Sequence, residues 1–490
     1  MGLSLRRCGG RGQGLWRTTG ECAPCALLSG QPLESGGTVT AASPDASPAP
    51  AQGAQGGAPD ETPDRAPATR VQLLLAIPAL VVGAVSALIL FALDELSEWL
   101  EGLIWHTLPE ATGLDPSNGF FIFTVLTLTG IAVGLVVWQL PGHGGRDSAT
   151  TELIAPPLPL RSLPTLALVA TLGLAGGVSL GPENPIIAIN AGLMAAVVGR
   201  MFTRVPVQLT VMMAAAGTVG ALFGTPVAAA LVLTGIVAAF PRGGALWDRL
   251  FLPLVAAGAG SVTMRFLAHP TFELPLPAYD TIAPIDLLSG AGIAVAAAAF
   301  GVLCVVLFRA LHRFFHGFGN PLVYITLGGV ALGLLGALGG EITLFKGLAQ
   351  MGELITNAGE YSGLQLLSIF GVKLLALAVA GASGFRGGHI FPAVFLGVAF
   401  GMYANVLVPA IPLTLAVGAG VLGMVLAIAR DGWIALFVAT LVTGSVVALP
   451  LLCIAILPAW LLVSRAPEMV VAEVPDTNRV LNPFRRRAAA

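Results

Sequence analysis

Residues 181–185 read Gly-Pro-Glu-Asn-Pro and interrupt a long apolar stretch with a single carboxylate. A second pentad, Gly-His-Ile-Phe-Pro at residues 388–392, repeats the glycine and the proline 207 positions later (388 − 181 = 207). Glycine and proline interrupt helices, and two interrupted apolar segments at corresponding places in a membrane protein indicate a binding site. The two pentads therefore predict two related halves that meet at a site inside the membrane.

The composition indicates a membrane protein. Of the 490 residues, 56% are hydrophobic and only 10% are charged, against about 25% charged residues in soluble proteins. We therefore predict an all-α polytopic membrane protein. The formal net charge is −2 and no basic stripe is present, so nucleic acid is not an expected partner. The lone motif Cys22-Ala-Pro-Cys25 indicates neither a metal site nor a disulfide framework, and no cofactor is predicted.

Apolar runs separated by turn residues recur from Val71 onward. A perpendicular crossing takes about 20 residues, so the runs 163–180 and 185–199 are expected to be half-helices that meet near the membrane interior. The run 432–464 is expected to hold two helices, with Pro450 at their boundary. The other expected spans are 71–93, 120–140, 207–238, 249–267, 285–310, 321–339, 364–381, 389–408 and 411–429.

Five segments are expected along the chain. Residues 1–68 are rich in Gly, Ala, Pro and Ser without apolar periodicity, which predicts a disordered tail. The remaining segments are a first transmembrane half (69–268), a connecting loop (269–284), a second half (285–470) and a short C-terminal tail (471–490), with no soluble regulatory domain after the last span.

Charges near the chain ends predict the orientation in the membrane. Arg65 and Arg70 precede the first span, and Arg485, Arg486 and Arg487 close the chain. Positive residues favour the cytoplasmic side, so both termini are expected there, with an even number of crossings. The expected location is the cell membrane, and the family resemblance described below implies the inner membrane of a bacterium.

The pentads have the chemistry of an anion site. A helix N-terminus leaves its first backbone N–H groups unpaired and carries about half a positive charge, so converging termini can hold an anion without a cationic side chain. Gly181 and Gly388 allow a ligand to approach the backbone, while Pro185 and Pro392 suit a first helical turn. The alternative is that both pentads are packed breaks in transmembrane helices.

Glu183 is the only acidic residue between Glu152 and Asp248. An ionisable group at membrane depth costs at least about 2.5 kcal/mol on insertion scales, so its presence calls for an explanation. It could be a partner of the helix dipole. Alternatively, the carboxylate occupies the position of a permeating anion and leaves when it is displaced or protonated, which would make Glu183 a gate.

The sequence from Leu180 to Pro185 resembles the GREGP or GKEGP element of the CLC family of chloride channels and chloride/proton antiporters, and in particular a bacterial branch of ion-transport proteins. The resemblance extends over roughly Val71 to Met469. It implies two inverted-topology halves whose broken and tilted helices meet at a mid-membrane anion site. It also implies that Glu183 is the gating glutamate, with Gly181 and Asn184 beside the anion.

Two further motifs of the family are matched in part. Gly387-Gly388-His389-Ile390-Phe391-Pro392 resembles GGIFAP, whose backbone amides bind the central anion, so the resemblance implies His389 and Ile390 as donors. The first site motif, GSGIPE, corresponds to Gly142-His143-Gly144-Gly145-Arg146-Asp147, where His143 replaces the anion-coordinating serine and Gly144 follows it. Gly142 and Gly387 are further expected helix breaks.

Two departures from the family bear on proton coupling. Gly235 and Ile236 stand where antiporters have a glutamate pair that includes the internal proton-transfer residue, and Met469 replaces the central tyrosine. The resemblance therefore favours uncoupled anion transport over chloride/proton antiport, although antiport and a transporter of another small anion stay open. It implies a homodimer with one pore per subunit in the lipid bilayer. The anion, chloride or another halide or nitrate, is not specified.

Several other residues have two interpretations. His143 could donate to an anion, or be a solvated loop histidine. Arg386 could attract anions at a cleft mouth, or snorkel to the membrane interface. Arg430 and Asp431 indicate a structural ion pair or a turn.

An enzyme is not expected. The sequence Gly381-Ala382-Ser383-Gly384 matches the GxSG of intramembrane serine proteases. Such a serine needs a histidine base on a later span. Only His389 follows Ser383, and it is too close in sequence to lie on a separate span.

Overall fold

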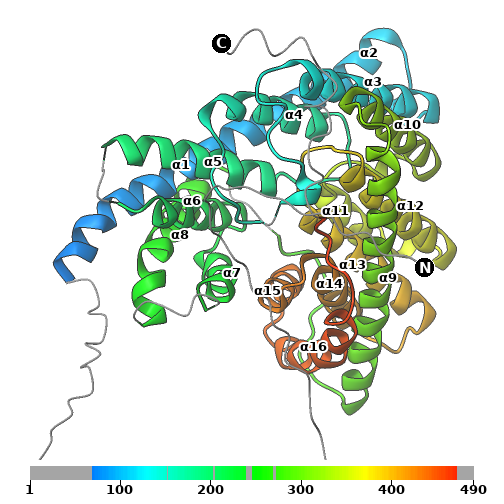
Figure 1. Ribbon diagram of the computed structural model, residues 1–490. Coiled ribbons are helices and arrows are strands. Elements are labelled where there is room, and N and C mark those ends of the chain that lie inside the picture. The colour runs from blue at the N-terminus through cyan, green and yellow to red at the C-terminus, as the bar shows by residue number, and fades with distance from the viewer. Residues whose placement is uncertain (1–68, 152, 202–204, 239–244, 269–271, 472–490) are drawn as a thin grey trace, which may run out of the picture. The chain divides into compact units, whose positions relative to one another are not determined.

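The computed structural model describes residues 69–151, 153–201, 205–238, 245–268 and 272–471 (Figure 1). The predicted N-terminal tail (1–68), residues 472–490 of the predicted C-terminal tail, and the cysteines of the CxxC motif lie outside these residues. The described residues are helical, with one isolated β-bridge. The helices are α1 (Thr69–Gly102), α2 (Leu108–Thr112), α3 (Gly119–Gln139), α4 (Leu163–Ala175), α5 (Glu183–Met201), α6 (Val207–Leu222), α7 (Pro226–Ala238), α8 (Leu246–Leu267), α9 (Pro284–His316), α10 (Pro321–Gly339), α11 (Leu348–Thr356), α12 (Gly363–Ala382), α13 (Ile390–Leu407), α14 (Leu413–Ala429), α15 (Gly432–Thr443) and α16 (Leu449–Val463).

Within the described residues, eight helices are long and apolar enough to cross a membrane. The run 432–464 divides into α15 and α16, with Pro450 in the first turn of α16, as predicted. The prediction of two half-helices is right for α4, which has 13 residues, and wrong for α5, which has 19 and continues beyond the apolar run to Met201. The run expected at 207–238 is two helices, α6 and α7, separated by a turn at residues 223–225.

Helices of similar length recur in the same order along the chain. The starts of α3 and α10 differ by 202 residues (321 − 119), those of α5 and α13 by 207 (390 − 183), and those of α6 and α14 by 206 (413 − 207). Helices α7 and α8 have counterparts in α15 and α16, and α1 has one in α9. This order supports the proposed division into halves at residues 268 and 285.

Small residues bring the helices of each proposed half into close contact. A Cβ atom at Gly83 of α1 would overlap the carbonyl oxygen of Ala256 on α8, and a Cβ at Gly423 of α14 would overlap that of Ala294 on α9. Close backbone approach through small residues is typical of membrane helices, where dispersion contacts rather than water exclusion hold helices together.

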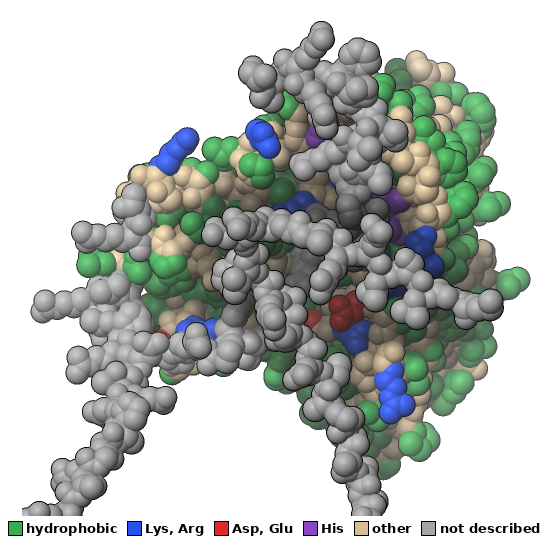
Figure 2. Space-filling view, viewed as in Figure 1, with side chains coloured by type: hydrophobic (Ala, Val, Ile, Leu, Met, Phe, Trp, Pro, Cys, Tyr) green, Lys and Arg blue, Asp and Glu red, His purple; other side chains and the backbone are tan. Residues whose placement is uncertain are grey.

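Large apolar side chains cover much of the outer surface. Phe266, Leu338 and Leu364 are 82%, 79% and 78% exposed. Figure 2 shows hydrophobic side chains over the flank formed by α3, α10 and α12, while Lys and Arg side chains are scattered over the visible face. Exposed apolar area on this scale marks a surface that contacts lipid or another protein rather than water.

Candidate anion site

The two pentads lie directly against each other. The Gly181 amide donates to the Gly388 carbonyl at 2.8 Å, and the Gly388 amide donates back to the Gly181 carbonyl at 2.7 Å. Helix α5 begins two residues after Gly181, and α13 begins two residues after Gly388. The starts of two helices therefore converge, as predicted, although their direct backbone pairing was not predicted.

The carboxylate of Glu183 belongs to the first pentad but is bound by the second. Its Oε1 accepts a hydrogen bond of 2.8 Å from the Ile390 amide, and the side chain is 1% exposed. Its Oε2 has no hydrogen-bond partner among the described residues. A Cβ atom at Gly388 or at Gly181 would overlap the Glu183 carboxyl group, so a larger residue at either position would displace that group.

An aromatic cluster covers one side of this site. The rings of Phe391 and Phe223 stack at 6.2 Å with an interplanar angle of 3°, and Phe272 contacts both rings. Phe437 of α15 meets Phe223 edge to face at 5.7 Å. Sequence reasoning missed this wall, because the four rings come from four separate segments and share no motif. The cluster makes the surroundings of the carboxylate apolar.

The loop at residues 142–148, in the first proposed half, is bonded to the backbone that leads into the second pentad. Arg386 donates from Nε to the Gly144 carbonyl at 3.1 Å and from Nη1 to the Gly384 carbonyl at 2.6 Å, and Nη1 lies 3.4 Å from Asp147 Oδ1. The Gly387 amide donates to Ser148 Oγ at 3.0 Å. Arg386 is only 7% exposed. Both interpretations of Arg386 are therefore wrong, because a buried, paired guanidinium neither faces a cleft mouth nor reaches the interface.

Asp147 is ionised at neutral pH despite its burial. Burial raises the pKa of this carboxyl, but the Arg386 guanidinium and the contact with His316 outweigh burial and hold the pKa at about 2. Asp147 Oδ2 lies 3.1 Å from His316 Nε2. Ser148 and Asp147 were not predicted as site residues, although Asp147 is the last residue of the motif that contains His143 and Ser148 follows it directly.

The loop at residues 340–347, in the second proposed half, is bonded in a corresponding way to the backbone that leads into the first pentad. Lys373 of α12 is fully buried, and its Nζ donates to three carbonyls, those of Thr343 (3.0 Å), Leu344 (2.7 Å) and Phe345 (2.8 Å). The Phe345 amide in turn donates to the Gly177 carbonyl at 3.1 Å, four residues before the pentad. A lysine inside the apolar run 364–381 was the available signal for this contact.

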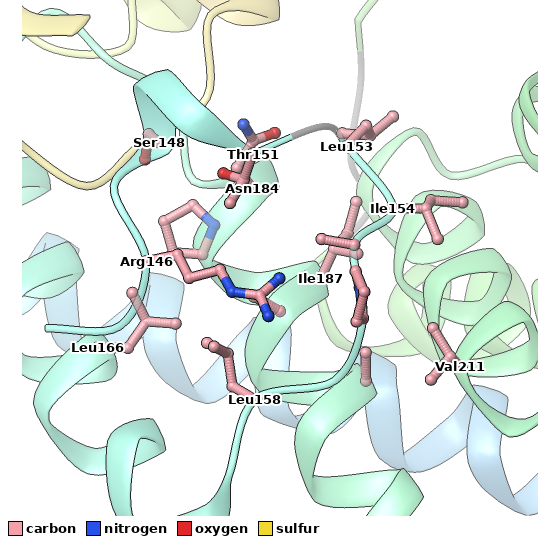
Figure 3. A pocket seen from close by; sticks show the side chains of 15 residues that line it. Arg146, Ser148, Thr151, Leu153, Ile154, Leu158, Leu166, Asn184, Ile187 and Val211 are labelled. Atoms are coloured by element: carbon pink, nitrogen blue, oxygen red, sulfur yellow. The ribbon is translucent and has the colours of Figure 1, made fainter. Parts of the chain in front are cut away.

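Asn184 and Pro185 line a pocket beside the start of α5. Figure 3 shows Arg146 reaching across this pocket, with Ser148, Thr151 and Asn184 on its polar side. Apolar residues form most of the remaining wall. The structure therefore turns Asn184 towards a pocket that adjoins the pentads. Pro185 and Pro392 lie in the first turns of α5 and α13, as predicted.

The two histidines predicted at the site lie in different surroundings. His389 is the N-cap of α13, and its Nε2 is buried without a hydrogen-bond partner in the described part of the chain. His143 has an exposed ring whose Nδ1 lies 2.8 Å from the Val137 carbonyl oxygen at the end of α3. Gly144 offers its carbonyl to Arg386, and Gly142 has a φ of 93° that favours glycine.

Three further positions were singled out in the sequence, namely Met469, Arg430 and Asp431. Met469 is 4% exposed and lies two residues before Val471, whose amide donates to the Ala149 carbonyl at 2.8 Å. Arg430 and Asp431 do not pair with each other. Arg430 lies 3.5 Å from Glu468 and donates to backbone carbonyls after α16, whereas Asp431 caps α15 through two backbone amides.

Ser383 is fully buried, and its Oγ has no hydrogen-bond partner in the described residues. It therefore lacks the histidine base that a serine protease needs. Among the described residues, Asp147, His312 and His316 are the one group of three side chains that could hold a metal ion, with donor atoms within 4.8 Å of one another.

The arrangement defines a multi-pass helical membrane protein with a buried carboxylate bound at converging helix starts. Residues 129–464 match the family model described as voltage gated chloride channel. The ion-transport proteins YfeO of Escherichia coli O9:H4 (strain HS) and K12 (strain DH10B) are each 46% identical over 409 residues, which are 83% of this chain and 96% of the relative. The chain belongs to the CLC family and is an anion-transport protein rather than an enzyme.

Solved structures agree at the level of the fold. The crystal structure of a CLC-type fluoride/proton antiporter superposes with a TM-score of 0.66 at 21% identity, over 82% of this chain and 98% of that chain. A slow cyanobacterial Cl⁻/H⁺ antiporter gives a TM-score of 0.62 at 16% identity, over 81% and 94% of the two chains. The predicted CLC fold is therefore confirmed.

Proposed function

We propose that this protein moves a small inorganic anion between the starts of α5 and α13, with Glu183 as the gate. The observation that carries the proposal is the hydrogen bond from the Ile390 amide to Glu183 Oε1 at 2.8 Å. A backbone amide at a helix start is the donor that an anion would use. Because the carboxylate occupies this donor, an anion can bind there only after Glu183 leaves.

The pocket beside α5 supports an approach route for the anion. Arg146 brings a guanidinium into a wall that also contains Ser148 and Asn184 (Figure 3). A cation in a recess with apolar walls raises the local concentration of anions. His389, Ile390 and Gly181 would then surround the anion at the pentads, whereas His143 would contact the anion near the C-terminal end of α3.

Chloride or another halide is the proposed anion. The solved structures with this fold include a fluoride/proton and a Cl⁻/H⁺ antiporter. We further propose a homodimer with one pore per subunit, located in the bacterial inner membrane with both termini in the cytoplasm.

Uncoupled transport is the first candidate, because Ile236 and Met469 replace the family's proton-transfer glutamate and central tyrosine. Proton antiport is the second candidate, and one observation favours it. Asp431 Oδ2 lies 3.7 Å from the position that a Cβ atom at Gly235 would take. A neighbouring helix thus brings a carboxylate to the region where Gly235 and Ile236 lack one.

Anion efflux from proteoliposomes tests the gate. We expect Glu183→Gln to change the rate by about tenfold, since replacing a charge-assisted hydrogen bond by a neutral one costs roughly 1–1.5 kcal/mol. Glu110→Gln, at an exposed position of α2, is the matched control and should leave the rate unchanged. An unaltered rate and unaltered pH dependence in Glu183→Gln would remove Glu183 from the mechanism.

A pH probe inside the same vesicles separates the two candidates. Uncoupled transport predicts no proton uptake against its own gradient when an anion gradient is applied. Anion-driven proton uptake that Asp431→Asn abolishes, with anion flux retained, would establish the second candidate instead. Asparagine keeps the cap of α15, so this variant changes the charge alone.

A further inference from the structure

The last turn of α9 places two histidines beside Asp147. His312 and His316 are four residues apart, so they share one face of the helix. One donor atom from each of these three residues lies within 4.8 Å of the others. Cations are also favoured at a helix C-terminus, where the unpaired carbonyl groups carry partial negative charge. The sequence signal, His-x-x-x-His at 312–316, was present but was not singled out.

His316 places one ring nitrogen against a backbone carbonyl and the other against a carboxylate. Its Nδ1 lies 3.1 Å from the His312 carbonyl oxygen, which can only accept, so Nδ1 carries the hydrogen. In the neutral ring, Nε2 is then an acceptor, yet it lies 3.1 Å from Asp147 Oδ2, which is also an acceptor. Two acceptors at this distance need a proton or a metal ion between them.

The separation of Asp147 Oδ2 and His316 Nε2, 3.1 Å, fits two ligands of one metal ion. Two ligands about 2.0–2.1 Å from a tetrahedral zinc ion are roughly 3.3 Å apart, close to the Asp147–His316 separation. A hydrogen bond from the second ring nitrogen to a backbone carbonyl is the usual support of a metal-bound histidine, and Tyr324 stacks on the His316 ring at 4.5 Å.

His312 supplies an independent observation. Its side chain is 2% exposed, and its Nδ1 has no hydrogen-bond partner among the described residues. A buried polar atom without a partner is rare and calls for an explanation, such as a bound ion. The side chains of His316 and Asp147 are 21% and 14% exposed, which gives an ion a route to the group.

We propose that Asp147, His312 and His316 bind a divalent transition metal ion of the zinc class, and that the bound ion slows anion transport. Two imidazoles and one carboxylate select zinc, nickel, cobalt or copper over calcium and magnesium. The proposed slowing of anion transport by the bound ion rests on the proposed function. Asp147 also pairs with Arg386, which precedes Gly387 and Gly388. A metal ion held by Asp147 repels the Arg386 guanidinium and so disturbs the backbone that pairs with Gly181.

Calorimetric titration of zinc into the full chain tests the binding. The protein is purified through a tag without histidine and treated with chelator. We expect one zinc ion per chain, and binding about tenfold weaker or more in His312→Ala and in His316→Ala. His106→Ala, at an exposed position between α1 and α2, is the control and should bind as the parent chain does. Size-exclusion profiles check that each variant folds.

Two further measurements decide the alternatives. Cobalt should give visible absorption bands of a site with nitrogen ligands in the parent chain, and the bands should be lost in His316→Ala. No zinc binding at millimolar concentration, or binding in both histidine variants as tight as in the parent chain, would overturn the site and leave only a shared proton between Asp147 and His316. Anion flux without metal tests the proposed function separately. Flux in the parent chain that zinc leaves unchanged would overturn the inhibition.

Discussion

The loops at residues 142–148 and 340–347 perform the same task in the two halves with different chemistry. Each holds the backbone that leads into the pentad of the other half. The second loop is held by one amine, that of Lys373, which is fully buried and serves three carbonyls. The first uses Arg386, Asp147 and the Ser148 hydroxyl, and the Asp147 side chain is 14% exposed. The difference indicates a fixed support for the pentad with Glu183 and an adjustable support for the pentad with the amide donors.

Lys373→Met should have the largest effect on stability. The variant keeps the length of the side chain but leaves three buried carbonyl groups without their donor. Each unsatisfied buried group costs about 1–3 kcal/mol, so we expect a loss of roughly 3–5 kcal/mol, partly offset by relief from burying an amine. Thermal unfolding in detergent measures this loss.

Lys346→Met is the matched control, because Lys346 lies in the same loop. Its Nζ pairs with Asp94 at 3.0 Å, and both side chains are about a quarter exposed. Such a pair contributes about 0–1 kcal/mol. Equal losses in the two variants would contradict the distinction between buried support and surface pair.

Asp147→Asn should lower the free energy of unfolding by about 3 kcal/mol, somewhat less than Lys373→Met does. The substitution leaves the buried Arg386 guanidinium without its counter-charge, while its two carbonyl partners remain. If this support is the adjustable one, anion flux should fall together with stability. A variant as stable as the parent chain would show that the carbonyl groups alone hold Arg386.

Gly388→Ala should lower the free energy of unfolding by about 1–3 kcal/mol. It should also displace the Glu183 carboxylate, because the added methyl group would overlap that carboxyl group. Combining it with Glu183→Ala should recover most of the loss, since the overlapping group is then absent. Gly371→Ala, at a helical position of α12 with open space around it, is the control and should be neutral or stabilising. Additive losses in the double variant would show that the two residues do not interact.

The sequence contains enough information for most of the fold and for half of the site. Apolar runs and Gly-Pro breaks predict the helices, because each of these signals is local. Glu183 and Ile390 can be predicted to converge because each lies at a recognisable helix start. The contacts of Lys373, Ser148 and the aromatic cluster cannot be predicted in this way, since each joins segments far apart in sequence. The two interpretations of Arg386 failed for a similar reason, because they assumed an exposed guanidinium and the carbonyl partners come from a distant loop.

Apart from the control variants, Ser148→Ala should have the smallest effect on stability. It is also the most direct test of the difference between the two loops. It removes the acceptor of the Gly387 amide, which would be left buried and unpaired at a cost of about 1–2 kcal/mol. Ser148→Thr keeps the hydroxyl and should retain most of the stability. Because the Ser148 hydroxyl also lines the pocket with Arg146, the alanine variant should lower anion flux more than it lowers the unfolding temperature. A proportionate loss of both would mean that Ser148 supports the backbone only and takes no part in guiding the anion.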